Sequence, residues 1–573
     1  MSTSRRTFIK SVGAAGVAVY SSDMLLDLLA QTPAGNVTKS RFKGLADIVL
    51  TEAKTAGCSY ADVRFTMNMG LPGGSANFTT AATRGGGPGG APGGFPGGGG
   101  GGGGRGGGGG GRGGGGRGGG GGRGGGRGGD IPTDAERQAG GFGVRVIHSG
   151  VWGFASSPIV TEDEIRRITR VATEVARASA IAKKRDVRLA PVKAYVENYI
   201  TPMKKDPRTV SAADKQAWCQ AIVDKASKVQ GVTAVNVGIS HSYEWRYFAS
   251  SEGSYIEQEI FTTSPSFSVS ARVGEVTRTR TYSGVSGTAG WEIAEECDFL
   301  DVAEKVATDA VEMCTAKPLG ASGRRDLILS PSHAMLTIHE IVAHPTELDR
   351  VVGYEANYAG TSFIRLPDIG KLKYGSRHFN ITADRTSRGL GSFGFDDDGV
   401  KTMQWPIVRE GILVGLQNNR ETAHFLNMDY SQWNTFGSSW RDYPFLRMPN
   451  VHADPGPANS PKLAEIVADT KNGVMIDGRG SYSIDQQRYN GQFGGHIFWE
   501  IKDGKITRQV TNVTYNAITT EFFANLDAVT GPSEWQMHGT GGDAKGQPTQ
   551  TNSISHGSPW MRIKNIMVGA AFD

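Results

Sequence analysis

Apolar residues in the first third of the chain recur at spacings that alternate between those of helices and those of strands. Positions three and four apart indicate a helix with one buried face, whereas every second position indicates a half-buried strand. Gly57 marks the end of the first helix. The expected elements are a helix over residues 44–57, strands over residues 61–65, 143–147 and 150–155, and a helix over residues 161–178. They predict an N-terminal α/β unit over residues 35–180.

The pattern changes further along the chain. Helical spacing returns near residues 212–228 and 301–314, with alternating strands such as residues 267–273 between them. Beyond the second of these helices, short strands and turns dominate and a single helix stands out. We therefore expect a central α/β unit over residues 181–320 and a β-rich C-terminal domain over residues 321–573, which together make an α/β (α+β) fold.

A glycine-rich tract interrupts the first unit. About 35 of the 83 glycines lie between Gly85 and Gly129, and five arginines within the tract match the net charge of +5. The tract has too few apolar side chains for their burial to offset the conformational entropy that the backbone would lose on folding. We therefore expect a disordered surface insertion. Arginines spaced in glycine are typical of segments that bind single-stranded nucleic acid. We expect a solvated insertion instead, because the tract has one aromatic residue, Phe95, for stacking on bases.

The N-terminus carries a pattern typical of export. Residues 4–10 read S-R-R-T-F-I-K, which matches the twin-arginine signal, and a mildly apolar stretch follows. Two aspartates interrupt that stretch, and no run in the chain reaches the roughly 18 apolar residues that a membrane span needs. We expect a signal peptide over residues 1–34, cleaved after Ala30 or Ala34, and a periplasmic or extracellular protein.

One helix of the C-terminal domain carries the candidate chemistry. A predicted strand ends just before it, Ser330 is a suitable N-cap, and Pro331 stands at the first helical position, where proline is preferred. The helix then contains His339, Glu340 and His344 in the order H-E-x-x-x-H. The better-known zinc spacing is H-E-x-x-H, and two incidental histidines are the alternative interpretation.

The spacing of the two histidines poses a geometric problem. Five residues apart on an ideal helix, two imidazoles point about 140° apart and cannot reach one ion. Pro345 disfavours α geometry at His344, so we expect His344 to be the frayed or π-like last residue of the helix, beside His339. Two neutral imidazoles and a third protein ligand would leave one zinc position for water. Glu340 is then expected to act as the general base toward that water.

The chain resembles the TldD/PmbA peptidase family, because several segments match the motifs of that family in the same order. Residues 339–349 are similar to the catalytic H-E-A-V-G-H-G-x-E-x-D of the TldD branch. The other matching segments are residues 45–65 with Y-A-D, 143–146 with G-V-R-V, 152–155 with W-G-F-A, 395–400 with D-D-D-G, 411–418 with G-I-L-V-G-L-Q-N, and 447–450 with R-M-P-N. We interpret D-D-D-G as a hairpin turn rather than a calcium site.

The resemblance implies a third zinc ligand near the C-terminus, where the chain departs from the family pattern. The family has a cysteine in a C-G-x-x-G-Q segment just before the last strand, whereas no cysteine follows Cys314 here. His538 stands in the place of that cysteine, and three imidazoles form a good zinc site. We therefore expect the metal ligands to be His339, His344 and His538. The alternatives are that Glu347, Asp349 or His556 supplies the ligand, or that the site is inactive.

The resemblance also implies a function and a partner. It implies a zinc metallopeptidase that hydrolyses small or unfolded peptides, held as an added strand, and the twin-arginine pattern adds the expectation that this enzyme is exported. It also implies pairing with a PmbA/TldE-type chain that lacks the motif, or self-association. The alternative function is that of a catalytically inactive partner subunit in such a heteromeric peptidase. Binding of nucleic acid through the glycine tract is a third, less favoured hypothesis.

Overall fold

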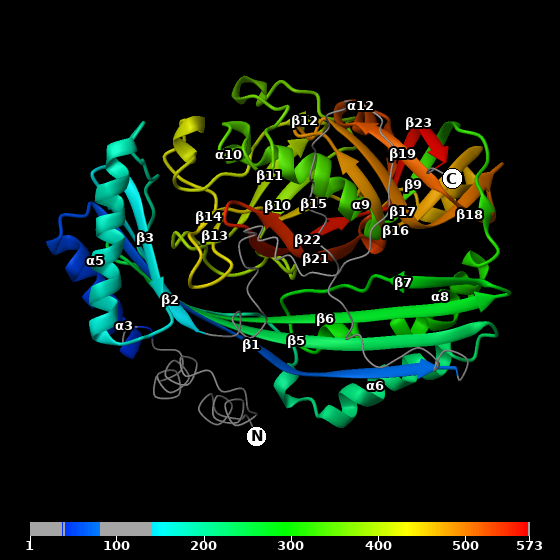
Figure 1. Cartoon of the computed structure of the whole chain (residues 1–573). Coiled ribbons are helices and arrows are strands. Elements are labelled where there is room, and N and C mark those ends of the chain that lie inside the picture. Colours follow the sequence, from blue (N-terminus) through cyan, green and yellow to red (C-terminus); the bar gives the residue numbers. More distant parts are fainter. Residues whose placement is uncertain (1–36, 38–39, 81–139, 571–573) are drawn as a thin grey trace, which may run out of the picture.

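The computed structural model describes residues 37, 40–80 and 140–570. The expected export signal (residues 1–34) and the glycine-rich tract (residues 85–129) lie outside these residues. A long sheet forms the base of the molecule, and the C-terminal domain lies over one half of that sheet (Figure 1). Throughout the described ranges, no helix combines the length and the apolar character that crossing a membrane requires.

The long sheet joins the two α/β units that the sequence predicts. Its seven strands follow the order β3-β2-β1-β5-β6-β4, and β7 also pairs with β6. They are β1 (Tyr60–Thr79), β2 (Gly141–His148), β3 (Val151–Ser157), β4 (Val196–Ile200), β5 (Val232–Ser250), β6 (Tyr255–Val273) and β7 (Val276–Tyr282). Because β1 pairs with β5 along nearly its whole length, residues 35–180 and 181–320 share one continuous sheet rather than forming separate layers.

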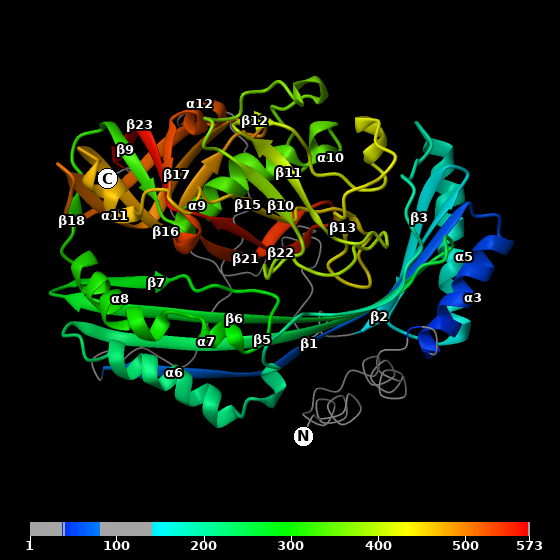
Figure 2. The ribbon, with the colours of Figure 1, turned by 180° about the vertical axis from the view of Figure 1, so that it is seen from behind.

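Two separate helical layers cover the two ends of this sheet (Figure 2). One core buries Trp245 and the other buries Val235, so a single strand, β5, supplies both. The helices are α3 (Arg41–Thr55) and α5 (Glu162–Ser179) at one end, and α6 (Ala212–Ala226), α7 (Glu292–Glu295) and α8 (Phe299–Met313) at the other. Their positions confirm the helical spacing in the sequence, and the side chains of Ser40 and Thr161 cap the first two.

The C-terminal domain is rich in β-structure, as predicted. Its largest sheet has eight strands, and five of them close into a ring because β16 pairs with both β9 and β17. The strands of this sheet are β8 (Lys317–Pro318), β9 (Gly323–Leu329), β16 (Asn472–Ile484), β17 (Asn490–Lys502), β18 (Lys505–Thr511), β19 (Val513–Ile518), β20 (Leu526–Val529) and β23 (Met561–Ala570). Side chains from this ring pack together with the helix that carries the histidines.

Smaller sheets complete the domain around that helix. A four-stranded sheet has the order β12-β11-β10-β15, and β13–β14 and β21–β22 form separate pairs. These strands are β10 (Ile381–Asp384), β11 (Gln404–Arg409), β12 (Ile412–Leu413), β13 (Thr435–Phe436), β14 (Phe445–Leu446), β15 (Asn450–Ala453), β21 (Gln536–Lys545) and β22 (Gln550–Ser558); the helices are α9 (Pro331–Ile338), α10 (Leu348–Val351), α11 (Leu463–Ala468) and α12 (Thr519–Ala524). Both β21 and β22 pack against α9.

A buried ionic cluster connects the long sheet to the C-terminal domain. The D-D-D-G segment does form a tight turn, with Gly399 at φ 76°, but its carboxylates are buried rather than exposed. Asp397 accepts hydrogen bonds from Arg64 at 2.7 Å and from Arg246 at 2.9 Å, and both arginines belong to the long sheet. Arg145 likewise reaches Asp398 at 2.8 Å. The sequence pattern identified the turn and missed this role in docking the domains.

The two arginines determine the pKa of the Asp397 carboxyl. Burial by itself raises the pKa of the Asp397 carboxyl, but Arg64 and Arg246 outweigh burial and lower that pKa below its usual value. Removing one partner from a buried ion pair leaves the other charge uncompensated. The resulting loss of folding stability is far larger than the net stability that the intact pair contributes. The docking of the two parts of the molecule therefore depends on Asp397 remaining ionised.

We predict that Asp397→Asn lowers the free energy of unfolding by about 3–5 kcal/mol, because Arg64 and Arg246 lose their buried counter-charge. Urea or thermal denaturation of the full chain measures the change. The control is Glu52→Gln, which breaks a half-exposed pair with Arg166 and should cost less than about 1 kcal/mol. Equal effects of the two substitutions would contradict the role assigned to the cluster.

Candidate metal centre

The helix that carries the two histidines changes its winding where they occur. Ser330 caps α9 through a hydrogen bond to the backbone N–H of His333, and Pro331 occupies the first turn, as the sequence predicts. At His339 the α-helix becomes a π-helix, η5 (His339–Ala343), and a 3₁₀ turn, η6 (His344–Thr346), follows. The N–H of His344 bonds the carbonyl of His339, five residues back. This wider turn brings the two imidazole rings to 4.5 Å between centroids.

Pro345 acts differently from the sequence prediction. The expected π-like helix end at His344 is confirmed, but His344 keeps helical angles, φ −60° and ψ −48°, so the expectation that Pro345 disfavours α geometry at this residue is wrong. Proline instead removes the N–H that would bond the carbonyl of Ile341 four residues back. That carbonyl accepts a hydrogen bond from the hydroxyl of Tyr374 at 2.6 Å. A side chain from another segment thus satisfies the backbone group that the proline leaves without a donor.

Asp543 joins the two histidines in a buried cluster. Its Oδ1 lies 3.7 Å from Nε2 of His339 and 3.6 Å from Nε2 of His344. Ligand atoms of a tetrahedral zinc site, with bonds of about 2.1 Å, lie about 3.4 Å apart, so these three atoms have nearly the separation that zinc requires. Imidazole nitrogen and carboxylate oxygen are both ordinary zinc ligands. The residues present therefore fit a zinc ion held by His339, His344 and Asp543.

The structure does not bring His538 to the two histidines, which corrects our expected ligand set. His538 and Asp543 lie on the same strand, β21, five residues and therefore about 16 Å apart along it. His538 Nε2 lies 3.4 Å from the side-chain oxygen of Gln536, and its Nδ1 finds no hydrogen-bond partner among the residues that the structure describes. Asp543 follows a bulge at Gly541 and Gly542. An acidic residue after two glycines, in the segment that resembles the family's last ligand, was the signal that the prediction overlooked.

The three residues named as alternatives to His538 surround the cluster without joining it. Nδ1 of His344 lies 2.9 Å from Oε2 of Glu347, and Nδ1 of His339 lies 2.9 Å from Nε2 of His556. Asp349 lies one step further out, 2.8 Å from the ammonium of Lys545. Glu347 and His556 therefore orient the two imidazole rings through their Nδ1 atoms, as partners of metal-binding histidines commonly do.

Hydrogen bonding assigns the tautomers of both candidate ligands. His556 Nδ1 lies 2.8 Å from the carbonyl of Val451 and 3.3 Å from the N–H of the same residue. The shorter contact favours donation from Nδ1 to the carbonyl, which leaves Nε2 of His556 as an acceptor. His339 must then donate from Nδ1 to His556, and His344 donates from Nδ1 to Glu347. Both histidines consequently present an unprotonated Nε2 toward Asp543, which is the form that binds a metal ion.

Burial and neighbouring charge favour the neutral form of these imidazoles. Burial, together with the charges of Arg479 and Arg488, lowers the pKa of His339 to about 3. Burial and Arg488 also lower the pKa of His344 well below its usual value. Both imidazoles are therefore neutral at neutral pH, so a metal ion would not have to displace a proton from Nε2 of either residue.

The carboxylate of Glu347 is held in its ionised form. Burial would raise the pKa of Glu347, but the ammonium of Lys545 at 2.8 Å and the guanidinium of Arg350 at 3.3 Å lower it well below its usual value. Lys545 is itself completely buried between Glu347 and Asp349. An ionised Glu347 accepts the Nδ1 proton of His344 strongly, which fixes the orientation of that ring.

Glu340, the expected base, lies beside the cluster and is almost completely buried. Its carboxylate forms an ion pair with Arg488, and burial raises the pKa of Glu340 whereas Arg488 and a hydrogen bond with Tyr482 lower it. Burial dominates, so the pKa of Glu340 stands above its usual value. A carboxylate with a raised pKa accepts a proton more readily, which suits a general base.

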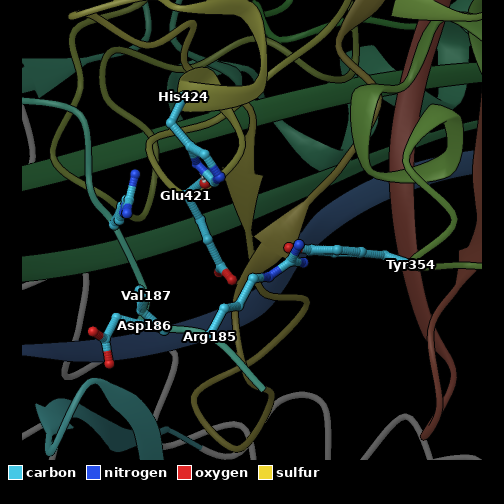
Figure 3. Close-up of a pocket in the computed structure, with 7 residues that line it drawn as sticks. Arg185, Asp186, Val187, Tyr354, Glu421 and His424 are labelled. Carbon is cyan, nitrogen blue, oxygen red and sulfur yellow. Dashed lines mark hydrogen bonds between the residues drawn. The ribbon is translucent and has the colours of Figure 1, made fainter. Parts of the chain in front are cut away.

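A separate hollow lies away from these residues. Arg185, Asp186, Tyr354, Glu421 and His424 are among the residues that line a pocket of about 210 Å³, and Figure 3 shows Arg185 extending toward Tyr354 across it. The guanidinium of Arg185 stacks over the Tyr354 ring at 4.7 Å. None of the candidate zinc ligands contributes to this pocket, so its shape gives no information about the chemistry at the metal centre.

Three consecutive regions of the chain match one family. Residues 322–570 match the PmbA/TldA metallopeptidase C-terminal domain, residues 205–313 match the central domain, and residues 127–182 match domain 1. Together they cover most of the chain in the order expected for the family.

Individual relatives agree with this match. A metalloprotease of Methanothermobacter thermautotrophicus is 29% identical over 434 residues, which cover 75% of this chain and 89% of that protein. A zinc metalloprotease TldD homolog of Saccharolobus solfataricus is 21% identical and covers 75% of this chain and 90% of its own length. The crystal structure of TldE from Thermococcus kodakarensis has the same fold, with a TM-score of 0.64 at 13% identity over 92% of this chain and all of that chain. The chain therefore belongs to the PmbA/TldD family of metallopeptidases.

Proposed function

We propose that the chain is a zinc-dependent peptidase in which His339, His344 and Asp543 hold the metal and Glu340 is the general base. The observation that carries the proposal is the approach of two unprotonated imidazole nitrogens to Asp543 at 3.6–3.7 Å, directly beside a buried carboxylate. One relative, the TldD homolog of Saccharolobus solfataricus, is named a zinc metalloprotease, which supports zinc as the metal.

Each residue of the site has a separate role in peptide hydrolysis. A bound zinc ion polarises a peptide carbonyl and lowers the pKa of water. Glu340 takes a proton from the water whose oxygen attacks the carbonyl carbon, and it returns that proton to the leaving amine as the C–N bond breaks. Glu347 and His556 hold the imidazoles in position throughout, because each accepts the Nδ1 proton of one histidine.

The burial of the site supports small or unfolded peptides as substrates. His339, Glu340 and His344 are 3–8% exposed, so a folded protein surface cannot reach them, whereas an extended chain can. Such a chain is recognised through main-chain hydrogen bonds, which tolerate many sequences. We also propose that the chain pairs with a TldE-type partner or with itself, which the match to the TldE fold supports.

Metal content tests the ligand set. We predict that Asp543→Asn weakens zinc affinity by more than about 100-fold, because changes even to groups behind the ligands cost 10- to 100-fold. His538→Ala should retain zinc in the folded protein. Elemental analysis and a competing chelator measure both variants. Loss of zinc in His538→Ala with retention in Asp543→Asn would restore the ligand set expected from the sequence.

Glu340→Gln tests the base separately from the metal. We predict that this variant retains zinc and loses about 10²- to 10⁴-fold in kcat, since the carboxylate takes a proton and does not hold the ion. Hydrolysis of a fluorogenic peptide mixture by the zinc-loaded full chain measures kcat. An undiminished rate would exclude Glu340 as the base, and a wild-type chain without any peptidase activity would favour an inactive partner subunit.

Export is a further part of the proposal, and it rests on the twin-arginine pattern at Arg5 and Arg6. Replacing both residues with lysine should retain precursor in the cytoplasm, because the receptor reads this address through the arginine pair. Cell fractionation of the full chain and the double variant measures the effect. Unimpaired export of the variant would contradict the proposed route.

A further inference from the structure

Arg447 is the buried partner of the candidate ligand that the sequence did not predict. It lies between β14 and β15, and the side chains of Arg447 and Asp543 are 0% and 3% exposed. Nη2 of Arg447 lies 2.6 Å from the backbone carbonyl oxygen of Asp543 and 3.2 Å from its Oδ2. A single nitrogen therefore donates to both the main chain and the side chain of Asp543.

The two carboxylate oxygens of Asp543 have different surroundings. Oδ2 accepts the hydrogen bond from Arg447, whereas Oδ1 lies 3.6–3.7 Å from the Nε2 atoms of His339 and His344. A carboxylate can bind a metal ion through one oxygen or through both. The charge-assisted hydrogen bond occupies Oδ2 and holds it on the guanidinium, which leaves Oδ1 as the oxygen that is free to bind a metal ion.

Binding through one oxygen matters for the proposed reaction. A catalytic zinc site has three protein ligands and keeps one position for water. A carboxylate that bound through both oxygens would compete with water for that position. The contact of Arg447 with Oδ2 of Asp543 therefore favours the coordination that hydrolysis requires.

The segment that carries Arg447 is itself fixed to the strand that carries Asp543. Nη2 of Arg385 donates to the carbonyl of Arg447 at 3.2 Å and to that of Met448 at 3.1 Å. Asn552, which pairs with Asp543 across the β21–β22 hairpin, donates to the same carbonyl of Met448 at 3.1 Å. The guanidinium and the carboxylate are thus held together through the main chain as well as through their own contact.

The position of the guanidinium serves this one carboxylate. Within the part of the chain that the structure describes, Asp543 is the only ion-pair partner of Arg447, and Nη2 is the only nitrogen of its guanidinium that has a hydrogen-bond partner. Burying a charged group with incompletely bonded donors destabilises a fold. Such local departures from stability are expected at functional sites, which indicates that Arg447 acts on Asp543 rather than on the packing of the domain.

We propose that Arg447 is the positioning residue that makes Asp543 a one-oxygen zinc ligand. Its Nη2 fixes the carboxylate through Oδ2, and Oδ1 completes the site with His339 and His344. The role rests on the proposed zinc peptidase function and deepens it, because it explains how an aspartate supplies the third ligand without closing the site to water.

Metal affinity tests this role without depending on turnover. Arg447→Met removes the guanidinium, whereas Arg447→Lys keeps a positive charge at the same place. In the folded full chain we expect Arg447→Met to weaken zinc binding about 10- to 100-fold, as loss of a group behind a metal ligand does. Arg447→Lys should recover part of that affinity. A competing chelator measures the Kd of both variants.

Visible absorption of the cobalt(II)-loaded chain reports the coordination directly. Cobalt(II) absorbs more strongly in a four-coordinate site than in a site with more ligands, because geometry determines its electronic transitions. We expect the strong absorption from the unaltered chain. Arg447→Met should absorb more weakly, because Oδ2 of Asp543 can then bind the metal as well. A purely structural role of Arg447 would lower stability without changing this spectrum.

Arg420 provides a matched control. Its side chain is 1% exposed and pairs at 2.7 Å with Glu252, which is not a candidate ligand. Arg420→Met should lower stability but leave zinc affinity and cobalt absorption unchanged. Unaltered affinity and absorption in both Arg447 variants, or in the lysine variant alone if the methionine variant does not fold, would overturn the positioning role and leave the proposed peptidase intact. Failure of the unaltered chain to bind either metal would instead contradict the proposed zinc site, and the role of Arg447 with it.

Discussion

The candidate centre depends on one local departure from α-helical winding. Two imidazoles five residues apart reach the same point only if the helix widens between them, and the bond from the N–H of His344 to the carbonyl of His339 produces that widening. Pro345 removes a competing α-helical donor, and Tyr374 bonds the carbonyl that this leaves without one. Further side chains pack the widened turn, with Gln417 donating to the carbonyl of Ala343. These hydrogen bonds to the backbone therefore place the two imidazoles side by side without requiring a metal ion.

A second constraint is that every carboxylate buried at the candidate centre needs a cationic partner. Glu340, Glu347, Asp349 and Asp543 are all buried, and each has a cationic partner that offsets the cost of leaving water. The domain junction follows the same rule, with Asp397 set between two arginines of the long sheet. The metal centre and the junction are therefore stabilised by similar ion pairs. Burial keeps the histidines neutral, and the pairing keeps Glu347 ionised, which together favour a metal site.

Local features of the fold and the site could be predicted, whereas features that depend on distant contacts could not. The cap at Ser330, the proline at the helix start and the meeting of His339 with His344 follow from neighbouring residues. The role of Asp543 could not be obtained in this way, because a bulge on β21 determines which residue of that strand meets the helix. Similarly, the D-D-D-G motif predicts a turn, but only the folded sheet brings Arg64 and Arg246 to it. The shared sheet of the first two units also depends on long-range strand pairing.

X-ray absorption at the zinc edge, combined with a crystal structure of the zinc-loaded chain, tests whether His339, His344 and Asp543 bind the metal. We predict one zinc ion bound by Nε2 of His339, Nε2 of His344 and a carboxylate oxygen of Asp543, with bonds of about 2.0–2.2 Å and one further position open to water. Glu340 should lie beside the ion without binding it. Zinc bound to His538 in place of Asp543, or an ion held away from His339 and His344, would contradict this ligand set.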